Sequence, residues 1–437
     1  MNLIVRQFDH RIGILSGTPD RGIIFKYDND YLSRPNAIAI SHSLPLDGRE
    51  YSTRECLPFF TGLLPDGELK RRISDYLHVS ESSTLKLLEA LGGECAGTIS
   101  LTNEDEEDLA GSDSTNTKFE ARYRKLETAE IASMIDRMAE RPLLTIDRDL
   151  RLSLAGAQQK ISLARFSDMW FLPLHGSPST HILKPSRDPG ASSNLLPDLA
   201  VNEYFCMQAA KAVGLPVPDT ELFFLDGIPV YIIARYDRDL FEAIDSGWIE
   251  PKVRRIHQED ACQANNIMPD RKYQNDGGPG FAELVTLINE CSKAPILDIR
   301  ILLQAAIFNY LIGNCDAHGK NFSILYGQTI LKANNTRLAP LYDLVSTTAY
   351  EGLTTKLSMS IGGEYRIERI RLEHFMRLGA IAGVTEKYMR GLIDSKLIQV
   401  PQAIEKASGL SALLPYKDLT DRIKRQMLER INILRTS

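Results

Sequence analysis

Short hydrophobic runs separated by polar and turn residues open the chain. Four short apolar segments, 3–7, 12–15, 23–27 and 37–41, are predicted to be strands. Leucines at helical spacing predict a helix over 83–91. These elements predict a mixed α/β unit. The acidic run Asn103-Glu-Asp-Glu-Glu-Asp108 and the small polar residues after it indicate a loop or linker.

The middle of the chain has a different pattern, which is β-rich beyond Ser153. An amphipathic helix is expected before this point, over 128–140. A second helix opens at Pro197-Asp198 and is closed by Gly214 after Val213. Strands are predicted over 160–166 and 170–174, joined as a hairpin by Ser167-Asp168, and over 180–184 and 231–234.

From about residue 257 the pattern is mostly helical. Apolar residues recur at helical spacing from Asp298 to Leu311, and Gly313-Asn314 is a stop signal for that helix. A β-rich part with one helix, a connecting strand and then a helical part is the order of a two-lobed kinase. We therefore predict an α+β, two-lobed protein-kinase-like fold with an additional N-terminal α/β subdomain and a mostly helical C-terminal lobe.

This pattern divides the chain into four parts. They are an N-terminal α/β subdomain (1–110), an acidic linker with a connecting helix (111–150), the nucleotide-binding part of the N-lobe with the hinge (151–256), and a helical C-lobe carrying the catalytic and metal-binding loops (257–437).

Composition narrows the class of protein. With 43% hydrophobic and 25% charged residues, the 437-residue chain has the composition of a globular protein with room for two or three domains. A formal net charge of −6 argues against bulk electrostatic binding to nucleic acid. The six cysteines form no C-x-x-C pair and no zinc spacing, so reduced thiols are expected.

No membrane association is expected from the sequence. The N-terminal residues lack the pattern of a signal peptide. The most apolar stretch, 299–313, contains Arg300 and is too short to span a bilayer. We therefore expect a cytoplasmic protein.

The segment Asp316-Ala-His-Gly-Lys-Asn321, followed by Leu-Tyr-Asp343, carries the clearest chemistry. In phosphotransferases one Asp accepts the proton of the attacking hydroxyl, while an Asn and a second Asp hold Mg²⁺. Oxygen ligands suit this small, hard ion. A polar turn rich in Asp, Asn and Gly is the alternative interpretation.

Upstream segments would supply the nucleotide-binding parts. Residues 153–160 form a small-residue loop, in which backbone N–H groups approach phosphate oxygens closely. Lys184 ends a strand and suits the α/β-phosphates, and Glu203 on the following helix is its candidate partner. The backbone at Arg235-Tyr236-Asp237 occupies the place of an interlobe hinge. The first three of these also have a simpler interpretation. The loop 153–160 could be a strand connection, Lys184 a solvated lysine, and Glu203 a surface carboxylate.

Taken together and in order, these segments resemble the HipA-type serine/threonine kinase toxins of bacterial toxin–antitoxin modules. The resemblance runs nearly end to end and is strongest in the following motifs: Ser153-Leu-Ala-Gly-Ala-Gln-Gln-Lys160, Thr180-His-Ile-Leu-Lys184, Asn202-Glu-Tyr204, Ala234-Arg-Tyr-Asp-Arg238, Gln258-Glu-Asp260, Tyr273-Gln-Asn-Asp-Gly-Gly-Pro-Gly280, Asp316-Ala-His-Gly-Lys-Asn321 and Leu341-Tyr-Asp-Leu344.

The resemblance implies residue roles. Asp316 resembles the catalytic base and Ser153 the serine whose autophosphorylation switches the kinase off, while Asn321 and Asp343 resemble the Mg²⁺ ligands. The residues that it places around ATP are Ala155, Gly156, Ala157, Gln158, Gln159 and Lys160 in the loop, Lys184, the hinge residues Ala234, Arg235 and Tyr236, and His318 and Tyr342.

The resemblance also implies partners. They are a HipB-like helix-turn-helix antitoxin, operator DNA reached mainly through that antitoxin, and a protein substrate such as glutamyl-tRNA synthetase. The chain lacks the three-glycine loop of eukaryotic-type kinases, and Leu344-Val345 replaces the Phe-Gly that follows their metal-binding Asp. A eukaryotic-style activation segment is therefore not expected.

Two other functions share some of these features. A small-molecule phosphotransferase would use the same Asp, Asn and Asp, but it needs neither Ser153 before the loop nor a separate N-terminal unit. A DNA-associated regulator would use the small basic excess of residues 416–437, although such an excess is usually a solvated helix face.

Overall fold

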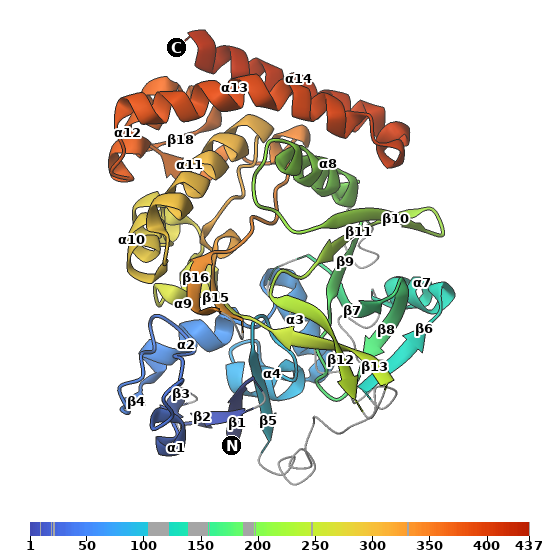
Figure 1. The fold of residues 1–437 in the computed structure, drawn as a ribbon, viewed down its shortest axis with the longest axis vertical. Helices are drawn as coiled ribbons and strands as arrows, with labels where there is room; N and C mark the ends of the chain where they lie inside the picture. The colour runs from blue at the N-terminus through green and yellow to red at the C-terminus, as the bar shows by residue number, and fades with distance from the viewer. Residues whose placement is uncertain are drawn as a thin grey trace.

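The fold is seen in a computed structural model of the chain. The structure describes every residue except 9, 19, 21, 104–121, 139–155, 157, 187–195, 197, 246–247, 330–331 and 437. Three parts surround one central region: an N-terminal sheet unit, a second sheet and a helical lobe. Figure 1 shows the N-terminal sheet and the helix pair α13–α14 at opposite ends of the molecule.

The N-terminal unit is an antiparallel five-stranded sheet in the order β4-β3-β2-β1-β5. Its elements are β1 (Asn2–Gln7), β2 (His10–Gly17), β3 (Ile23–Tyr27), α1 (Asn29–Leu32), β4 (Glu50–Tyr51), α2 (Thr53–Gly62), α3 (Gly67–Leu77), α4 (Thr84–Leu91) and β5 (Ile99–Asn103). Apolar side chains of this sheet and of the second sheet belong to one continuous core, with Leu3, Phe60 and Leu163 all fully buried.

One predicted strand of this unit is wrong. Residues 37–41 form no strand, only an isolated bridge between Ser41 and Leu44. Two tyrosine hydroxyls take the place of a neighbouring strand. The backbone N–H of Ile38 donates to the Tyr31 hydroxyl, and that of Ile40 donates to the Tyr27 hydroxyl, each at 2.9 Å. The segment therefore buries Ile40 fully without strand pairing, while Ala37, Ile38 and Ala39 are half-buried.

The second sheet has six strands in the order β10-β11-β9-β7-β8-β6. The predicted hairpin is confirmed, because Phe166 pairs with Met169 across a two-residue turn. The elements of this part are β6 (Tyr123–Leu126), α7 (Thr128–Arg137), β7 (Ile161–Phe166), β8 (Met169–Pro173), β9 (His181–Pro185), α8 (Leu199–Ala212), β10 (Thr220–Leu225) and β11 (Ile228–Ala234).

The chain then leaves β11 through the hinge into an antiparallel ribbon that the sequence did not predict, β12 (Arg238–Asp245) and β13 (Trp248–Arg255). The expected helical part also contains short strands. They are β14 (His257–Asp260), β15 (Ser323–Thr329) and β16 (Lys332–Leu338) in one sheet, and β17 (Lys356–Ile361) with β18 (Glu364–Arg366) in another.

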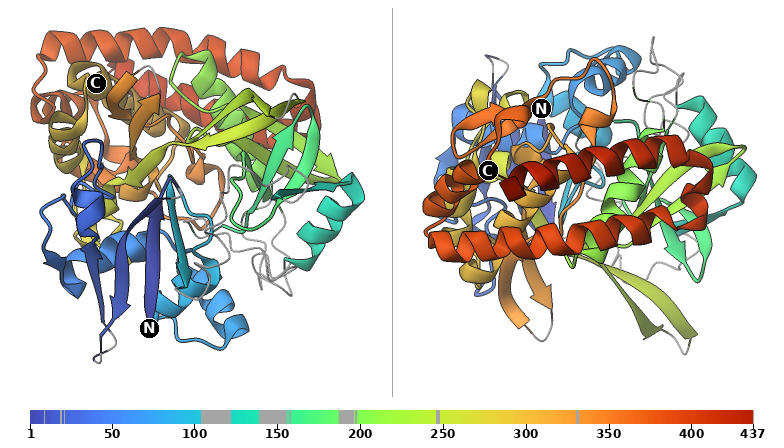
Figure 2. Two further views of the ribbon diagram at one scale, coloured as in Figure 1. Left: turned by 60° about the horizontal axis from the view of Figure 1, so that its bottom comes forward. Right: turned by 90° about the horizontal axis from the view of Figure 1, so that it is seen from above.

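Helices nevertheless make up most of the last part. Figure 2 shows the two longest, α13 and α14, side by side across the top of the molecule. The α-helices are α9 (Ala261–Ala264), α10 (Phe281–Cys291), α11 (Pro295–Ile312), α12 (Leu372–Ile381), α13 (Glu386–Ser408) and α14 (Lys417–Thr436). The 3-10 turns are η2 (Pro269–Arg271), η3 (Gln274–Asp276), η4 (Gly319–Asn321), η5 (Thr347–Ala349), η6 (Ile367–Arg369) and η7 (Ser411–Tyr416). The four-part division of the chain stays a prediction.

Helix α11 is longer than the apolar stretch seen in the sequence. At 18 residues with a mean hydropathy of 1.5, it is, within the described ranges, the one helix long and apolar enough to cross a membrane, and 67% of it is buried inside the fold. A buried core helix passes the same test, and Leu302, Leu303 and Ile307 are fully buried. Gly313 ends α11 in the left-handed conformation, with φ 72°.

Candidate active site

A cavity of about 560 Å³ lies where the three parts of the molecule meet. The N-terminal unit contributes Gly62, Leu63, Asp66 and Ala96 to its lining. Every described residue of the predicted site also lines it: Gly156, Gln158, Gln159, Lys160, Lys184, Glu203, Ala234, Arg235, Tyr236, Asp316, His318, Asn321, Tyr342 and Asp343. The predicted residues Ser153, Ala155 and Ala157 lie outside the described residues.

Lys184 on β9 is held between two carboxylates. Its Nζ donates to Oε1 of Glu203 on α8 at 2.7 Å and forms an ion pair with Asp343. Burial by itself would lower the pKa of Lys184, but the two carboxylates outweigh it and the pKa lies above the ordinary value. Burial raises the pKa of Glu203 to about 7, against the attraction of Lys184. The lysine is therefore a fixed positive charge at the cavity wall.

Asp343 and Asn321 lie side by side in the cavity. The Asn321 Nδ2 donates to Asp343 Oδ2 at 3.2 Å, and Lys184 contacts the other carboxylate oxygen. Asp343 has φ 53°, an uncommon conformation for a residue with a side chain, and its side chain stays 43% exposed. Partial desolvation opposes its ionisation, yet Lys184 holds the pKa of Asp343 well below its usual range. A carboxylate and an amide are side chains that can bind Mg²⁺; here the amide nitrogen faces Asp343 and the amide oxygen accepts from the His318 backbone N–H.

Such a site would need further ligands from outside the protein. In the part of the chain that the structure describes, no group of three or more His, Cys, Asp or Glu side chains could hold a metal. Mg²⁺ is commonly bound by one or two side chains together with phosphates and waters. The donor set of Asn321 and Asp343 therefore suits a metal that arrives with a phosphate ligand.

Asp316 follows α11 by a short turn that Asn314 organises. The Asn314 Oδ1 accepts from the Asp316 backbone N–H at 3.0 Å, and its Nδ2 donates to the Asp343 carbonyl at 3.3 Å. One side chain thus ties the loop of the predicted base to the loop of the predicted metal ligand. The Tyr273 hydroxyl donates to Asp316 Oδ1 at 3.1 Å. Desolvation raises the pKa of Asp316, and Lys272 and Tyr273 oppose this rise.

His318 lies deeper in the same loop. Its backbone N–H donates to Asn321 Oδ1 at 3.0 Å, which orients the amide toward Asp343. Burial, with Lys272 nearby, lowers the pKa of His318 to about 3, so the imidazole is neutral. Within the described ranges its Nδ1 is buried without a hydrogen-bond partner. A neutral ring with an unused polar atom in the cavity suits a role beside phosphate.

The small-residue loop reaches the cavity at Gly156, whose φ of 106° favours glycine. A Cβ there would lie 2.8 Å from the Lys160 Nζ. Gly156 bridges to Pro65, and its carbonyl accepts from the Asp66 backbone N–H at 3.3 Å. The same Asp66 forms an ion pair at 2.9 Å with Lys320 of the loop 316–321, which carries the predicted base. A residue of the N-terminal unit therefore contacts both loops of the site.

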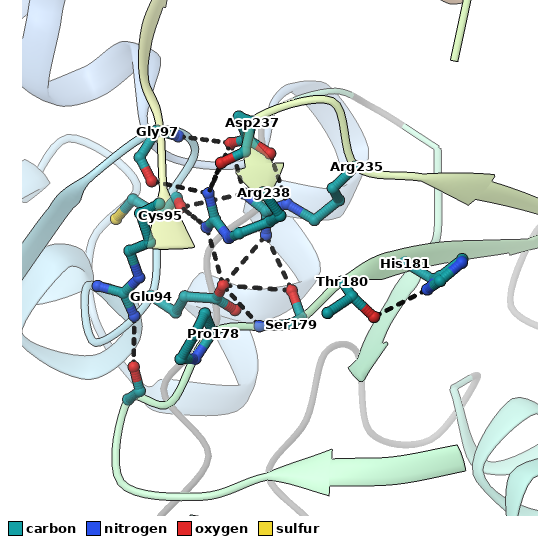
Figure 3. Close-up of polar contacts among 12 residues, drawn as sticks. Glu94, Cys95, Gly97, Pro178, Ser179, Thr180, His181, Arg235, Asp237 and Arg238 are labelled. Carbon is teal, nitrogen blue, oxygen red and sulfur yellow. Dashed lines mark hydrogen bonds and ion pairs between the residues drawn. The ribbon is translucent and has the colours of Figure 1, made fainter. Parts of the chain in front are cut away.

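The hinge is anchored by a buried charge cluster, which Figure 3 shows. The Arg235 backbone N–H donates to the Thr180 carbonyl at 2.8 Å, while its guanidinium pairs with Asp237 at 2.8 Å and Glu94 at 3.3 Å. Arg238 also reaches Glu94, at 2.9 Å. The Arg235 guanidinium is thus held by Glu94 of the N-terminal unit and by Asp237. The Arg235 backbone N–H is bonded to Thr180 and its guanidinium to carboxylates, so the predicted nucleotide contact at Arg235 stays a prediction.

Similarity to known proteins was found over almost the whole chain. Residues 152–404 match the family model described as the HipA-like C-terminal domain, and residues 3–102 match the HipA N-terminal domain. The Y4mE protein of Sinorhizobium fredii is 38% identical over 401 residues, covering 90% of each chain. The chain belongs to the HipA family.

A HipA-type fold is also what the solved structures show. A structure titled as the HipA, HipB and operator DNA complex of Shewanella oneidensis superimposes with a TM-score of 0.79 at 25% identity, covering 99% of this chain and 97% of that one. The predicted two-lobed kinase-like fold is confirmed. The serine/threonine-protein kinase toxin HipA of Shewanella oneidensis is 28% identical over 351 residues, 78% of this chain and 73% of that protein. Kinase activity is therefore supported for the family.

Four polar residues that sequence reasoning did not assign lie in or beside this HipA-type site. The sequence indicates Asn314 only as part of a helix stop signal. Tyr273 was visible as the start of a motif without a role, and Lys272 precedes it. Asp66 had no signal at all, because its contact with Lys320 spans 254 residues. Short-range patterns do not reveal such contacts.

Proposed function

We propose that this HipA-family chain is an ATP- and Mg²⁺-dependent serine/threonine-protein kinase that acts as the toxin of a bacterial type II toxin–antitoxin module. The observation that carries the proposal is the convergence of Lys184, Glu203, Asp316, Asn321 and Asp343 on one cavity. The first two form the buried lysine–glutamate pair of kinases, and the other three supply a base and oxygen ligands.

Each of these residues would have a separate role in phosphate transfer. Lys184 binds phosphate oxygens of the nucleotide, and the backbone at Ala234–Tyr236 receives the adenine. Asp316 takes the proton of the attacking hydroxyl on Oδ2, because Oδ1 already accepts from Tyr273. Asn321 and Asp343 would hold Mg²⁺, which supplies positive charge to the phosphates.

For the substrate and partners, the proposal is supported by the resemblance to the HipA family. We propose a translation-related protein substrate such as glutamyl-tRNA synthetase, whose phosphorylation in the cytoplasm would arrest growth. Autophosphorylation of Ser153 would place about −1.5 to −2 charges beside the nucleotide loop and inactivate the kinase. The solved HipA complex contains HipB and operator DNA. We propose a similar helix-turn-helix antitoxin here, with DNA bound mainly through it.

The proposal is tested by whether the Asp316→Asn variant still arrests growth. Expressed without an antitoxin, the parent chain should arrest bacterial growth and the variant should not, because general-base participation is worth about 10²–10⁴-fold in rate. Asp394→Asn is the matched control, since Asp394 is exposed on α13 and does not line the cavity. The purified proteins are then compared for ³²P transfer to glutamyl-tRNA synthetase.

Growth arrest by a folded Asp316→Asn protein at matched expression would favour a mechanism by binding alone. Phosphate transfer by that variant at the parent rate would show that Asp316 is not the base. Arrest by the parent chain with no label in the synthetase, but with label in another protein, would keep the kinase and replace the substrate.

A further inference from the structure

The segment Lys272–Gly280 is rich in glycine and polar residues, and the chemistry proposed above uses only the hydrogen bond from Tyr273 to Asp316. It folds through η3 and Gly277, which has φ 89°, into a tight loop. The Gly319 backbone N–H of the catalytic loop donates to the Lys272 carbonyl at 3.2 Å. The two loops are therefore joined through their backbones beside the predicted base.

Glycines allow this close contact. A Cβ at Gly319 would lie 2.3 Å from Cγ of Pro279, and a Cβ at Gly278 would lie 2.4 Å from the Arg271 carbonyl oxygen. Both positions would clash with any side chain. The Gly-Gly-Pro-Gly run at residues 277–280 thus fits the loop onto the catalytic loop, which explains the motif in physical terms.

The loop directs Tyr273 to the predicted base. The phenol donates to Asp316 Oδ1 at 3.1 Å, and its ring meets the His318 ring edge-on at a centroid distance of 5.4 Å. One oxygen of Asp316 is therefore fixed by a hydrogen bond. The other oxygen remains for the proton of a substrate hydroxyl.

The neighbouring Lys272 brings a positive charge to the same place. It lines the cavity, and its Nζ lies 5.3 Å from the centroid of the Tyr273 ring. Two other lysines of the cavity differ, because Lys184 is held by Glu203 and Asp343, and Lys320 by Asp66. Lys272 has no ion pair with any carboxylate of the described ranges, so its charge is available to an anion in the cavity.

We propose that the loop Lys272–Gly280 is a third part of the catalytic machinery, in which Lys272 contacts the phosphoryl group in transit and Tyr273 positions Asp316. This inference rests on the proposed kinase function. In the transfer, the substrate hydroxyl oxygen bonds to the γ-phosphorus, and the bond from that phosphorus to ADP breaks with its electron pair leaving on ADP. The hydroxyl proton passes to Asp316. Lys272 balances the negative charge on the transferring oxygens.

The test for Lys272 uses the full-length protein and the Lys272→Met and Lys272→Arg variants. Loss of one charge-stabilising donor lowers kcat by about 10²–10³-fold. Lys272→Met should show this loss with ATP affinity within about twofold of the parent protein, because Lys184 remains. Lys272→Arg keeps the charge and should recover at least part of the rate. The matched control is Lys356→Met, since the Lys356 Nζ lies 5.4 Å from the Tyr365 ring, away from the cavity lining.

A second measurement separates charge stabilisation from folding. Aluminium fluoride with Mg²⁺ and ADP mimics the transferring group and should bind the parent protein more tightly than ADP alone. Lys272→Met should lose this tightening and keep its ADP affinity. Equal tightening in both proteins, or a parent-like kcat in Lys272→Met, would overturn the role of Lys272.

Tyr273→Phe removes only the hydroxyl. Loss of a hydrogen bond to a charged group predicts a fall in kcat of about 10- to 100-fold with unchanged KM for ATP. Tyr365→Phe is the control on a half-buried tyrosine outside the cavity lining. A parent-like kcat would overturn the role of Tyr273. If Asp316→Asn is inactive while the Lys272 and Tyr273 variants are fully active, this inference fails and the kinase proposal stands. If the parent protein itself transfers no phosphate, the kinase proposal fails.

Discussion

Glu94 links the N-terminal unit to the hinge, and its removal should destabilise the protein strongly. Its side chain is only 1% exposed. Oε1 accepts from the Ser179 backbone N–H at 2.9 Å, from Arg238 at 2.9 Å and from Arg235 at 3.3 Å. Substitution by alanine would remove the acceptor of the buried Ser179 N–H and leave the two guanidiniums with neutral acceptors, the Ser179 hydroxyl and the Cys95 carbonyl, in place of the Glu94 carboxylate.

The expected magnitude follows from the charge balance. Two guanidiniums, Arg235 and Arg238, pair with two carboxylates, Glu94 and Asp237, and all four side chains are at most 3% exposed. A third buried arginine, Arg255, adds its positive charge near Glu94. Without Glu94, one buried guanidinium lacks a counter-charge. Removing one partner of a buried ion pair costs about 3–5 kcal/mol, so Glu94→Ala should lower the free energy of unfolding by that amount.

Urea unfolding followed by circular dichroism measures this effect. The control is Glu221→Ala, whose carboxylate also meets an arginine, Arg165, at 2.7 Å but is 53% exposed. An exposed pair should contribute less than about 1 kcal/mol. Because Arg235 also anchors the hinge backbone, Glu94→Ala should weaken ATP binding as well. If Glu94→Ala is no less stable than Glu221→Ala, the cluster does not hold the two units together.

Three further predictions concern the proposed site. Asn321→Ala and Asp343→Ala should each need more Mg²⁺ for activity or have none, and parent-like Mg²⁺ titrations would count against these ligands. After incubation with Mg²⁺ and ATP, mass spectrometry should locate a phosphate on Ser153, and phosphate found exclusively at other positions would contradict the switch. Desolvation raises the pKa of Asp316 while Lys272 opposes the rise, and the base must be ionised. Lys272→Met should therefore shift the acid limb of kcat/KM to higher pH, and an unshifted limb would argue against this electrostatic effect.

Local patterns in the sequence predicted many elements. The helical spacing of apolar residues and the glycine after it gave α11, which ends at Gly313, and a similar signal gave α8 before Gly214. The two-residue Ser167-Asp168 turn gave the hairpin, since both residues adopt positive φ. These signals are reliable because helix periodicity, caps and turns depend on residues a few positions apart.

Local patterns gave the wrong secondary structure in two places. In one, side chains distant in the sequence form the hydrogen bonds of the backbone, and in the other, charged residues interrupt the apolar pattern of a strand. The segment 37–41 has a strand-like composition, but the hydroxyls of Tyr27 and Tyr31 pair with its backbone. The ribbon of β12 and β13 was missed, since polar and charged residues interrupt its apolar pattern. Neither outcome depends on local propensity.

The order of the motifs along the chain determined the family and the proposed roles, because each motif is a short run of side chains with its own chemistry. Only the tertiary structure decided which groups meet. It placed Asp66 against Lys320, 254 residues away, and Glu94 against Arg235, 141 residues away. It also turned the Arg235 side chain into a buried cluster and set Tyr273 on Asp316. Such contacts depend on how whole sheets and lobes pack, and the free energy of burying a charge depends on the partner that this packing supplies.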